Sequence, residues 1–476
     1  MFSPSPGIPV LTVSALSCYS DSTIGDEKQM QQDKKTIYDI IVVGGGAAGL
    51  MAAGRAGQRG AKVLLLEKTD GCGKKILVSG KTRCNLTNAA ELKDFIAMYG
   101  VNGRFLHNAF HQFFRPELLG FFADYGVATK QERGGRIFPV SDNAPDVVQA
   151  LKQYLDDHQV RIELNSKVTI IRRGRGSFFE VQTSGGNYSA KAVILATGGA
   201  SWPQTGSTGD GYKISAELGH NIAALRPALV PLVVEEIELA KSMQGVALRN
   251  VRATAFQGRT QEVDAALTPQ INYGRGEKKS PHPPVIESRF GEMLFTHFGL
   301  GGPIILLMSL AVAESLEQGP VSILIDLKPA LTREHLRRRL QKDFNNYGKR
   351  KISRIIKEYL PGKMVGPFVA LASLDPEKQA HQINAPEKEK IIDHLKALRF
   401  NIKSSLPLTS AIVTAGGVSL AEIDPQTMSS RLIPGLYFCG EIMDIDADTG
   451  GYNLQAAFST GYVAGESAAK YVSNLD

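Results

Sequence analysis

The chain has 476 residues, of which 43% are hydrophobic and 21% are charged, and its formal net charge is +7. This length is more than one compact core needs, so we expect two or three domains in an ordinary soluble globular protein. No apolar run reaches the ~18 residues of a membrane-spanning helix. The four separated cysteines argue against a disulfide framework or a zinc site and suit a reducing cytoplasm.

The first 36 residues combine many Ser and Pro residues with a polar run, DEKQMQQDKK. Such a composition buries too little apolar surface to fold by itself, so we predict a disordered tail over residues 1–36. No basic residue precedes Lys28, which argues against the charged start of a secretory signal peptide.

Residues 38–67 have the order strand, glycine-rich turn, helix, strand, which is typical of a dinucleotide-binding unit. Between the apolar runs 40–43 and 63–66, three glycines have the spacing G-x-G-x-x-G: Gly44, Gly46 and Gly49. The first permits a sharp turn, the second leaves room for a pyrophosphate, and the third lets the helix approach the sheet. Glu67 ends the second strand, where a carboxylate accepts the ribose hydroxyls of adenosine and repels the 2′-phosphate of NADP.

The segment 68–88 is rich in Gly, Lys, Ser, Thr and Asn and lacks apolar periodicity. It leaves the predicted sheet beside the nucleotide, so its cations are expected near the cofactor. These cations are Lys74, Lys75, Lys81 and Arg83. The alternative interpretation is a polar surface loop.

The α/β pattern continues to residue 199. We predict helices over 105–114, 116–125 and 142–159, and strands over 161–171, 178–183 and 189–195. In this layout Val168 lies where a backbone contact to adenine is expected. The last strand leads into a turn with Thr197 and Gly198, whose N–H groups lie beside a cofactor.

From residue 226 the pattern changes to short strands, which predict an inserted β-barrel or sandwich over residues 226–328. The predicted strands cover 229–234, 246–256, 263–267, 292–298 and 321–327, and a loop covers 268–284. A helix is expected to begin at Pro303, directly after a glycine-rich turn.

Residues 329–403 predict an inserted helical module, because apolar residues recur at helical spacing. They are Leu336, Leu340, Phe344, Ile352, Ile355, Ile356, Tyr359, Ile391, Ile392, Leu395 and Leu398. Between Lys328 and Lys403 there are 18 Lys and Arg against 8 Asp and Glu, so the basic surplus of the chain lies here. It fits a solvated helical face, or a surface for an anionic substrate, a nicotinamide nucleotide or nucleic acid.

Residues 404–476 return to the first pattern, with strands predicted over 410–413 and 436–438, a glycine-rich loop and a helix of small residues. We therefore predict one discontinuous nucleotide-binding domain, formed by residues 37–225 and 404–476.

These motifs resemble known flavoproteins. The glycine motif with Glu67 is similar to the FAD fingerprint of glutathione-reductase-type flavoproteins. Five further segments resemble the HI0933/YhiN-like family, also called the aminoacetone oxidase or BaiN-type family of NAD(P)/FAD-dependent oxidoreductases. They are residues 71–75 (GCGKK), 79–88 (SGKTRCNLTN), 295–303 (FTHFGLGGP), 414–418 (TAGGV) and 440–461 (GEIMDIDADTGGYNLQAAFSTG). The resemblance implies an α/β fold with a glutathione-reductase-type Rossmann domain that is interrupted by the barrel and the helical module.

The resemblance also implies bound FAD and the residues that would hold it. They are Gly44, Gly46, Ala48, Gly49, Glu67 and Lys68 for the pyrophosphate and adenosine ribose; Lys75, Ser79, Gly80, Arg83, Asn85 and Thr87 on the path to the flavin; Val168, Thr197 and Gly198 near the adenosine half; and Gly440, Glu441, Asn453 and Leu454 near the ribityl chain and flavin ring. The family loop usually reads S-G-G-G-R-C-N, and here Lys81 and Thr82 replace two glycines. We expect this departure to narrow or charge the flavin pocket.

A flavin carries the redox step itself, so no catalytic triad is required. His297 is the candidate proton donor, because it lies between an apolar strand and a glycine-rich helix start; a structural histidine is the alternative. Cys72 and Cys84 are 12 residues apart and lack the arrangement of a disulfide reductase. We interpret three alternating carboxylates as a solvated loop, and no metal is implied: Asp444, Asp446 and Asp448.

We predict an FAD-dependent oxidoreductase that uses NAD(P)H as a transient co-substrate to reduce C=C or C=O bonds in a small organic or steroid-like molecule. The close alternative is an amine or aminoketone oxidase that passes electrons to O₂. From other classes, the alternatives are a flavoprotein that acts on or binds RNA through residues 329–403, and a redox sensor without turnover. No motif specifies an oligomeric state.

Overall fold

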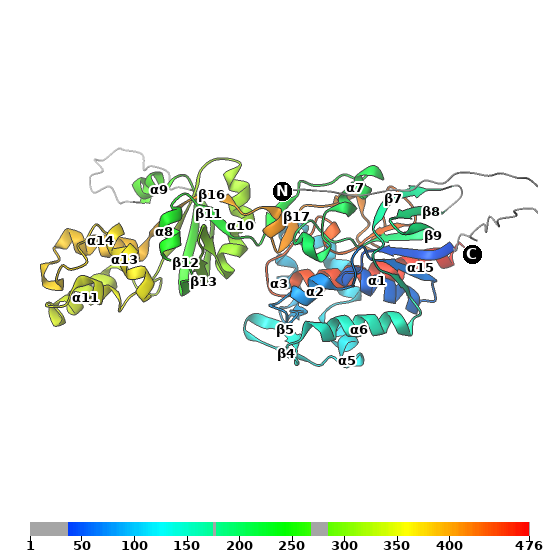
Figure 1. Ribbon diagram of the computed structural model, residues 1–476, viewed down its shortest axis with the longest axis horizontal. Coiled ribbons are helices and arrows are strands. Elements are labelled where there is room, and N and C mark those ends of the chain that lie inside the picture. The colour runs from blue at the N-terminus through cyan, green and yellow to red at the C-terminus, as the bar shows by residue number, and fades with distance from the viewer. Residues whose placement is uncertain (1–36, 175–177, 268–283, 476) are drawn as a thin grey trace, which may run out of the picture. The chain divides into compact units, whose positions relative to one another are not determined.

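The computed structural model describes most of the chain (Figure 1). The described ranges are residues 37–174, 178–267 and 284–475. The predicted tail, 1–36, and nearly all of the predicted loop, 268–284, lie outside them. By contacts between Cα atoms, residues 37–476 form one compact unit. Within the described ranges, no helix combines the length and apolarity needed to cross a membrane.

A seven-stranded sheet confirms the expected Rossmann architecture. Its order is β6-β2-β1-β9-β8-β7, and β18 pairs with β9 as a branch. The strands are β1 (Ile37–Val43), β2 (Val63–Leu66), β6 (Arg161–Glu163), β7 (Val168–Arg173), β8 (Phe179–Thr183), β9 (Gly186–Leu195) and β18 (Leu436–Phe438). β1 pairs in parallel with β2 and β9, and Val43 lies opposite Leu195. The turns that follow β1 and β9 therefore emerge at the same edge of the sheet.

One predicted strand, 161–171, is wrong because the structure divides it into β6 and β7. Asn165 has a φ of +54°, which bends the chain between them. The N–H groups of Asn165 and Ser166 donate to the carbonyls of Thr69 and Glu67, both at 2.9 Å. This turn thus runs beside the end of β2.

Helix α1 (Ala47–Gln58) packs closely against the long C-terminal helix α15 (Tyr452–Ser473), as the blue and red ribbons of Figure 1 show. A Cβ at Gly461 would lie 2.4 Å from the carbonyl oxygen of Ala48, and one at Gly465 would lie 2.3 Å from that of Ala52. The small residues of both helices are therefore what brings the two ends of the domain together.

Further helices and a small sheet complete this half of the chain. The helices are α2 (Lys74–Val78), α3 (Leu92–Ala97), α4 (His107–Gln112), α5 (Arg115–Asp124), α6 (Ala144–Asp157) and α7 (Asp210–Glu217). The small sheet has the order β3-β5-β4, formed by β3 (Thr87–Asn88), β4 (Thr129–Gln131) and β5 (Arg136–Pro139). The N–H of Leu86 donates to the carbonyl of Ile137 at 2.9 Å, which ties the loop after α2 to β5.

The expected barrel is present and closed, with the strand order β11-β14-β13-β12-β15-β16. Its strands are β11 (Leu232–Val234), β12 (Ala247–Gln257), β13 (Val285–Phe295), β14 (Gly299–Gly301), β15 (Val321–Asp326) and β16 (Leu398–Ser405), and pairing of β11 with β16 closes it. α8 (Ile237–Ser242) and α10 (Pro303–Leu316) pack against it. The helix predicted to begin at Pro303 is confirmed.

The predicted strand 263–267 is wrong, because these residues lie in helix α9 (Thr260–Leu267). The N–H of Arg259 donates to the Glu262 carboxylate at 2.8 Å, which stabilises a helix start. The helix-forming residues of the sequence TQEVDAAL outweigh the short apolar run at its end.

The helical module contains α11 (Arg333–Asn346), α12 (Ile352–Ile356), α13 (Gly362–Leu371) and α14 (Ala385–Lys396). Thr332 caps α11 by accepting the N–H of His335, and Leu336, Leu340 and Phe344 are buried as predicted. Leu398 was predicted on a helix, but it is the first residue of β16. Ala397, with φ of −151°, ends the helix, and the alternating residues that follow pair with β15.

Two large hydrophobic cores contain most of the buried apolar residues in the described ranges. One combines residues 38–214 with 418–472, and the other combines residues 232–402. Between them, β10 (Arg226–Ala228) pairs with β17 (Val413–Ala415). β17 begins where the predicted strand 410–413 ends. This grouping agrees with the domain boundaries given above, which stay a prediction.

Candidate functional site

The turn between β1 and α1 leaves open space where a pyrophosphate would bind. Gly44 has a φ of +106°, and a Cβ there would lie 2.5 Å from the carbonyl oxygen of Ala196. A Cβ at Gly49 would lie 1.8 Å from the carbonyl oxygen of Gly44, whereas a Cβ at Gly46 would meet nothing within 4 Å. Gly46 is the N-cap of α1, and no side chain caps the helix. The first N–H groups of α1 are therefore available to an anion.

Glu67 follows β2 and is buried, with 8% of its surface exposed. Its carboxylate accepts the N–H of Gly45 at 2.7 Å and the N–H of Thr69 at 2.8 Å. Since an ionised carboxylate has about four lone-pair sites, the fixed side chain still has acceptors for two ribose hydroxyls.

A pair of cations surrounds Asp210 near the same end. The Nζ of Lys68 donates to its carboxylate at 2.7 Å, and the Nζ of Lys167 lies 3.3 Å away. Burial would raise the pKa of Asp210, but hydrogen bonds from Lys68 and Thr208 outweigh it and lower the pKa to about 2. The positive charge of Lys68 is therefore largely compensated by the carboxylate of Asp210.

These features belong to one cavity of about 910 Å³. Most residues predicted to hold FAD line it: Gly44, Gly46, Ala48, Glu67, Lys68, Lys75, Ser79, Gly80, Arg83, Asn85, Val168, Thr197, Gly198, Gly440, Glu441, Asn453 and Leu454. They come from segments more than 350 residues apart in the sequence, which β1, β9, β18, α1 and α15 bring together.

Three predicted site residues do not line the cavity. Gly49 packs against Gly44, and a Cβ at Gly451 would lie 2.3 Å from the carbonyl oxygen of Thr87. Gly49 and Thr87 therefore support residues of the wall. His297, the candidate proton donor, is exposed, and its ring contacts Phe298 with centroids 4.8 Å apart. The structure does not bring His297 to the cavity.

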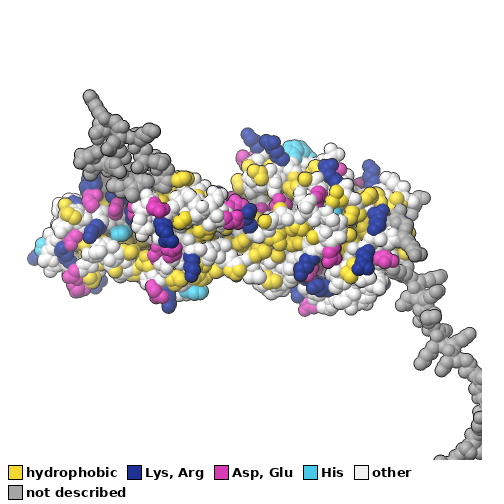
Figure 2. Space-filling view, turned by 90° about the horizontal axis from the view of Figure 1, so that it is seen from above, with side chains coloured by type: hydrophobic (Ala, Val, Ile, Leu, Met, Phe, Trp, Pro, Cys, Tyr) yellow, Lys and Arg dark blue, Asp and Glu magenta, His cyan; other side chains and the backbone are white. Residues whose placement is uncertain are grey.

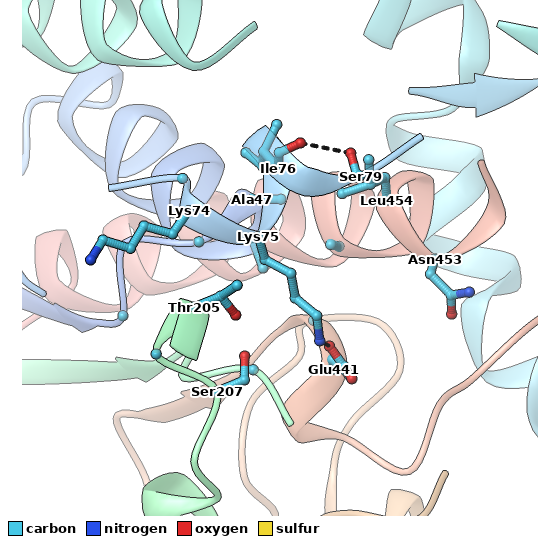
Figure 3. A pocket seen from close by; sticks show the side chains of 18 of the residues that line it. Ala47, Lys74, Lys75, Ile76, Ser79, Thr205, Ser207, Glu441, Asn453 and Leu454 are labelled. Atoms are coloured by element: carbon cyan, nitrogen blue, oxygen red, sulfur yellow. Dashed lines mark hydrogen bonds and ion pairs between the residues drawn. The ribbon is translucent and has the colours of Figure 1, made fainter. Parts of the chain in front are cut away.

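An ion pair joins two of the side chains that line the cavity (Figure 3). Lys75 extends from α2 to Glu441, with Nζ 2.6 Å from the carboxylate, while Lys74 points away from it. Lys75 also donates to the hydroxyl of Ser201 at 2.8 Å. The Glu441 carboxylate accepts the hydroxyl of Ser201 at 3.0 Å and the N–H of Thr414 at 2.9 Å. This network fixes the side chain expected to contact the ribityl chain.

The loop after α2 has an unusual backbone. Gly80, Lys81, Thr82 and Cys84 all have positive φ, between 56° and 65°. Apart from glycine, only Asn and Asp adopt this left-handed conformation with any frequency. Lys81 and Thr82 therefore occupy backbone positions suited to the glycines of the family loop. The side-chain oxygen of Asn85 is buried at the cavity wall without a hydrogen-bond partner in the described residues. An N–H donor of a bound molecule would satisfy it.

A second helix begins at the cavity. α15 starts after Gly450 and Gly451, which have φ of +144° and +100°, and no side chain caps it. Asn453 holds the preceding loop, since it accepts the N–H of Ala447 at 3.0 Å and donates to the Ala447 carbonyl at 2.9 Å. The partial positive charge of this helix start therefore lies at the cavity wall, where it stabilises negative charge.

The described cysteines do not form a redox pair. Burial, with a contribution from Glu67, raises the pKa of Cys72 to about 11, and burial raises that of Cys84 to about 12. Burial also raises the pKa of Cys439. A raised pKa keeps a thiol protonated near neutral pH. The absence of thiol exchange stays a prediction.

The three alternating aspartates lie at a neighbouring cavity of about 470 Å³, together with Arg226 and Glu314. Burial and the nearby carboxylates raise the pKa of Asp446 to about 6. Within the described ranges, no group of three or more His, Cys, Asp and Glu side chains has a geometry that could hold a metal ion.

Several lining residues were missed from the sequence. They are Trp202, Thr205, Gly206, Ser207, Asp210, Leu229, Arg136, Phe138, Ile412, Val413, Met443 and Ile445. The run GSTGD at residues 206–210 could have indicated part of the cavity wall, because it combines glycine and hydroxyl residues after a predicted turn. Leu229, Ile412 and Val413 carry no local signal, since only the pairing of β10 with β17 brings them to the cavity.

The donor set fits FAD. The open space above Gly46 and the uncapped start of α1 suit the pyrophosphate, and the free acceptors of Glu67 suit the ribose. The unpartnered Asn85 oxygen and the uncapped start of α15 suit the polar edge of a flavin.

Comparison with known proteins identifies the family. The family model described as HI0933-like protein Rossmann domain matches residues 38–467. The chain is 32% identical to the 3-dehydro-bile acid delta(4,6)-reductase of Clostridium scindens, over 90% of this chain and 99% of that protein. It is 29% identical to the ribosomal RNA dihydrouridine synthase of Escherichia coli, over 90% of this chain and 97% of that protein. The solved structure of a 3-ketosteroid-delta4-(5alpha)-dehydrogenase from Rhodococcus jostii RHA1 aligns with 92% of this chain and 98% of that chain, at 15% identity and a TM-score of 0.46. The chain therefore belongs to the HI0933-like Rossmann family and is an FAD-dependent oxidoreductase.

Proposed function

We propose that the protein uses NAD(P)H to reduce a C=C bond conjugated with a carbonyl group in a small, steroid-like molecule. Two relatives of different substrate class support this reaction type. The name of one specifies reduction of double bonds in a 3-oxo steroid acid, and the name of the other specifies conversion of uridine to dihydrouridine. In both cases hydrogen is added across a C=C bond next to a carbonyl.

The apolar wall of the cavity is the observation that favours a small apolar substrate. Leu229, Ile412, Val413, Met443 and Ile445 line it together, and Ile412 is 41% exposed. An apolar body would displace water from this wall, with a gain of about 25 cal/mol for each Å² buried. An extended, apolar ring system would contact such a surface more favourably than a charged substrate would.

Each part of the chain then has a defined task. The residues predicted from the resemblance hold FAD, which supplies hydride transfer. The start of α15 stabilises negative charge, and the Lys75–Glu441 pair fixes the ribityl side of the pocket. We assign no proton donor, because His297 lies outside the cavity. We also propose a cytoplasmic location, since the described cysteines are free thiols.

The test is anaerobic mixing of the purified yellow protein with NADH and with NADPH, followed by a steroid enone or by O₂. We expect one nucleotide to bleach the flavin and the enone to restore its colour faster than O₂ does. Bleaching by neither nucleotide would eliminate the reductase. Bleaching by an amine, with reoxidation only by O₂, would establish the oxidase alternative.

RNA is the second candidate substrate, favoured by the relatives named as ribosomal RNA dihydrouridine synthases. The basic module gives it limited support, because many of its cations are already paired. Arg337 contacts Glu389 at 2.6 Å and Glu334 at 2.7 Å, and Arg333 contacts Asp393 at 2.6 Å. Figure 2 shows the same interleaving of basic and acidic side chains on the face it draws.

Charge reversal tests the RNA candidate. If the module binds RNA, replacing Arg337, Arg338 and Arg339 with Glu will lower the affinity for ribosomal RNA and reduce its salt dependence. Unchanged affinity, with uridine-containing RNA unable to reoxidise the reduced flavin, would exclude this candidate.

A further inference from the structure

The flavin end of the cavity carries more cations than the protein neutralises. Five basic residues come from the loop after α2, from the small β3-β5-β4 sheet and from the turn between β4 and β5: Lys81, Arg83, Lys130, Arg133 and Arg136. Lys81, Arg83 and Arg136 line the cavity. Two carboxylates accompany them, Glu132 and Asp142.

The two carboxylates are fully used by two of the cations. Arg83 contacts Glu132 at 2.7 Å and Asp142 at 3.1 Å, and Lys130 contacts Asp142 at 2.6 Å. Arg83 lowers the pKa of Glu132, so this carboxylate is ionised. In the part of the chain that the structure describes, no carboxylate lies within 4.0 Å of Lys81, Arg133 or Arg136. Among the described residues, these three exposed side chains therefore have no carboxylate counter-ion. Lys81 and Arg136 line the cavity, and Arg133 lies beside it in the chain, three residues before Arg136.

The side chain of Arg136 is held in place by a backbone carbonyl and by Phe138. The Nε of Arg136 donates to the carbonyl of Arg133 at 3.1 Å. Two guanidinium groups lie over the Phe138 ring. That of Arg83 is 4.1 Å from the ring centroid, and that of Arg136 is 5.8 Å from it. Lys81 has a φ of +59°, a strained conformation that a glycine would adopt without strain. The chain therefore keeps a cation at a position where its backbone favours glycine.

We propose that Lys81, Arg133 and Arg136 form a binding site for the diphosphate of the nicotinamide nucleotide that reduces the flavin. Three uncompensated cations match a multiply charged oxyanion better than a single carboxylate, and Arg and Lys are the usual phosphate ligands. The chain has one complete dinucleotide fingerprint, which the proposed FAD site uses, and these side chains would supply the phosphate contacts that a second fingerprint would otherwise give. The inference rests on the proposed use of NAD(P)H, and it extends that proposal to the residues that bind it.

The experiment titrates the FAD-loaded protein with inorganic pyrophosphate by calorimetry, and separately measures the rate of flavin reduction against the concentration of NADH and NADPH. The variants are Lys81→Gln, Arg136→Gln and the double variant; Lys470→Gln is the control, because Lys470 is exposed and lies outside the cavity. We expect each single variant to weaken pyrophosphate binding about fivefold and to raise the half-saturating nucleotide concentration similarly. The control is expected to match the wild type.

The outcomes separate this inference from the proposed function. Failure of the wild type to be bleached by either nucleotide would remove the proposed function itself. Bleaching of the wild type, with an unchanged half-saturating nucleotide concentration in both single variants and in the double variant, would overturn the diphosphate site alone. Variants that affect only reoxidation by an anionic substrate, or that weaken RNA binding while nucleotide binding is unchanged, would also overturn it.

Discussion

Gly46 and Gly49 belong to one motif, but the structure gives them different roles. A Cβ at Gly46 has no protein atom within 4 Å, whereas one at Gly49 lies 1.8 Å from a backbone oxygen. We expect Gly46→Val to leave the free energy of unfolding of the FAD-free protein nearly unchanged and to weaken FAD binding at least about tenfold, since the side chain fills the pyrophosphate space.

Gly49→Val provides the contrast. It is expected to destabilise the fold itself, by about 2 kcal/mol or more, because α1 must move away from the strand end. Urea unfolding of the FAD-free proteins and fluorescence titration with FAD measure the two effects. Equal loss of stability in both variants would contradict the assignment of Gly46 to the cofactor.

At Lys81 we predict a substitution that stabilises the fold, in contrast to Gly49→Val. Lys81→Gly relieves a positive φ, although it also adds freedom to the unfolded chain, so we expect a net gain of about 0.5–1 kcal/mol in the free energy of unfolding. Lys81→Ala loses the same charge but keeps the strain, and it is expected to give little gain. Thermal unfolding of both variants makes the comparison, and an equal gain would show that charge repulsion is relieved instead of backbone strain.

At the scale of single elements, the loop 444–451 is expected to make the free energy of unfolding depend on pH. The raised pKa of Asp446, about 6 against an ordinary 3.8, means that the folded state holds its proton more tightly than the unfolded state. The free energy of unfolding therefore falls as pH rises from about 4 to about 6.

Asp446→Asn removes this dependence. We expect the variant to be about 1–2 kcal/mol more stable than the wild type near pH 7 and equal to it near pH 4. Urea unfolding at both pH values tests this, with the exposed Asp156→Asn as control. A gain that is the same at both pH values would point to repacking of the side chain and not to its titration.

Some elements were predictable from local pattern and others were not. β1, β2, β18, α1 and α10 follow from apolar runs beside glycines and proline, and the structure contains them. α9 and the division of 161–171 were missed, because a capping contact at Arg259 and a positive φ at Asn165 outweigh apolar content. A short apolar run does not distinguish helix from strand.

At the scale of the whole molecule, FAD would connect distant parts of the chain. The cavity walls come from the turn after β1, the loop after α2, the turn after β9 and the segments on both sides of β18. We expect FAD at about 1,000 times its Kd to stabilise the folded state by about 4 kcal/mol and to raise Tm by several degrees.

Riboflavin is the matched ligand for this measurement, because it lacks the pyrophosphate and the adenosine. It is expected to raise Tm less than FAD does in the wild type. In Gly46→Val the difference between the two ligands should shrink. Equal shifts in the wild type would mean that the adenosine half of the cavity is not used.

The part of the cavity wall formed by the turn after β1 was more predictable from the sequence than the part formed beside β10 and β17. Gly44, Gly46 and Glu67 are recognisable because a short contiguous unit presents them. Leu229 and Ile412 lie beside the paired strands β10 and β17, and Arg136 pairs with Asn88 of β3. Both pairings join residues distant in the sequence, which local periodicity does not encode. The position of His297 between an apolar strand and a glycine-rich turn predicts a site residue, but in the structure the side chain is exposed to solvent.

The chain contains a single tryptophan, Trp202, and it lines the cavity. Indole emission transfers energy efficiently to a nearby isoalloxazine, so filling the apoprotein with FAD should dim the intrinsic fluorescence, and Trp202→Phe should abolish the signal. The fluorescence of Trp202 would therefore report the fraction of protein that holds FAD, without an added label.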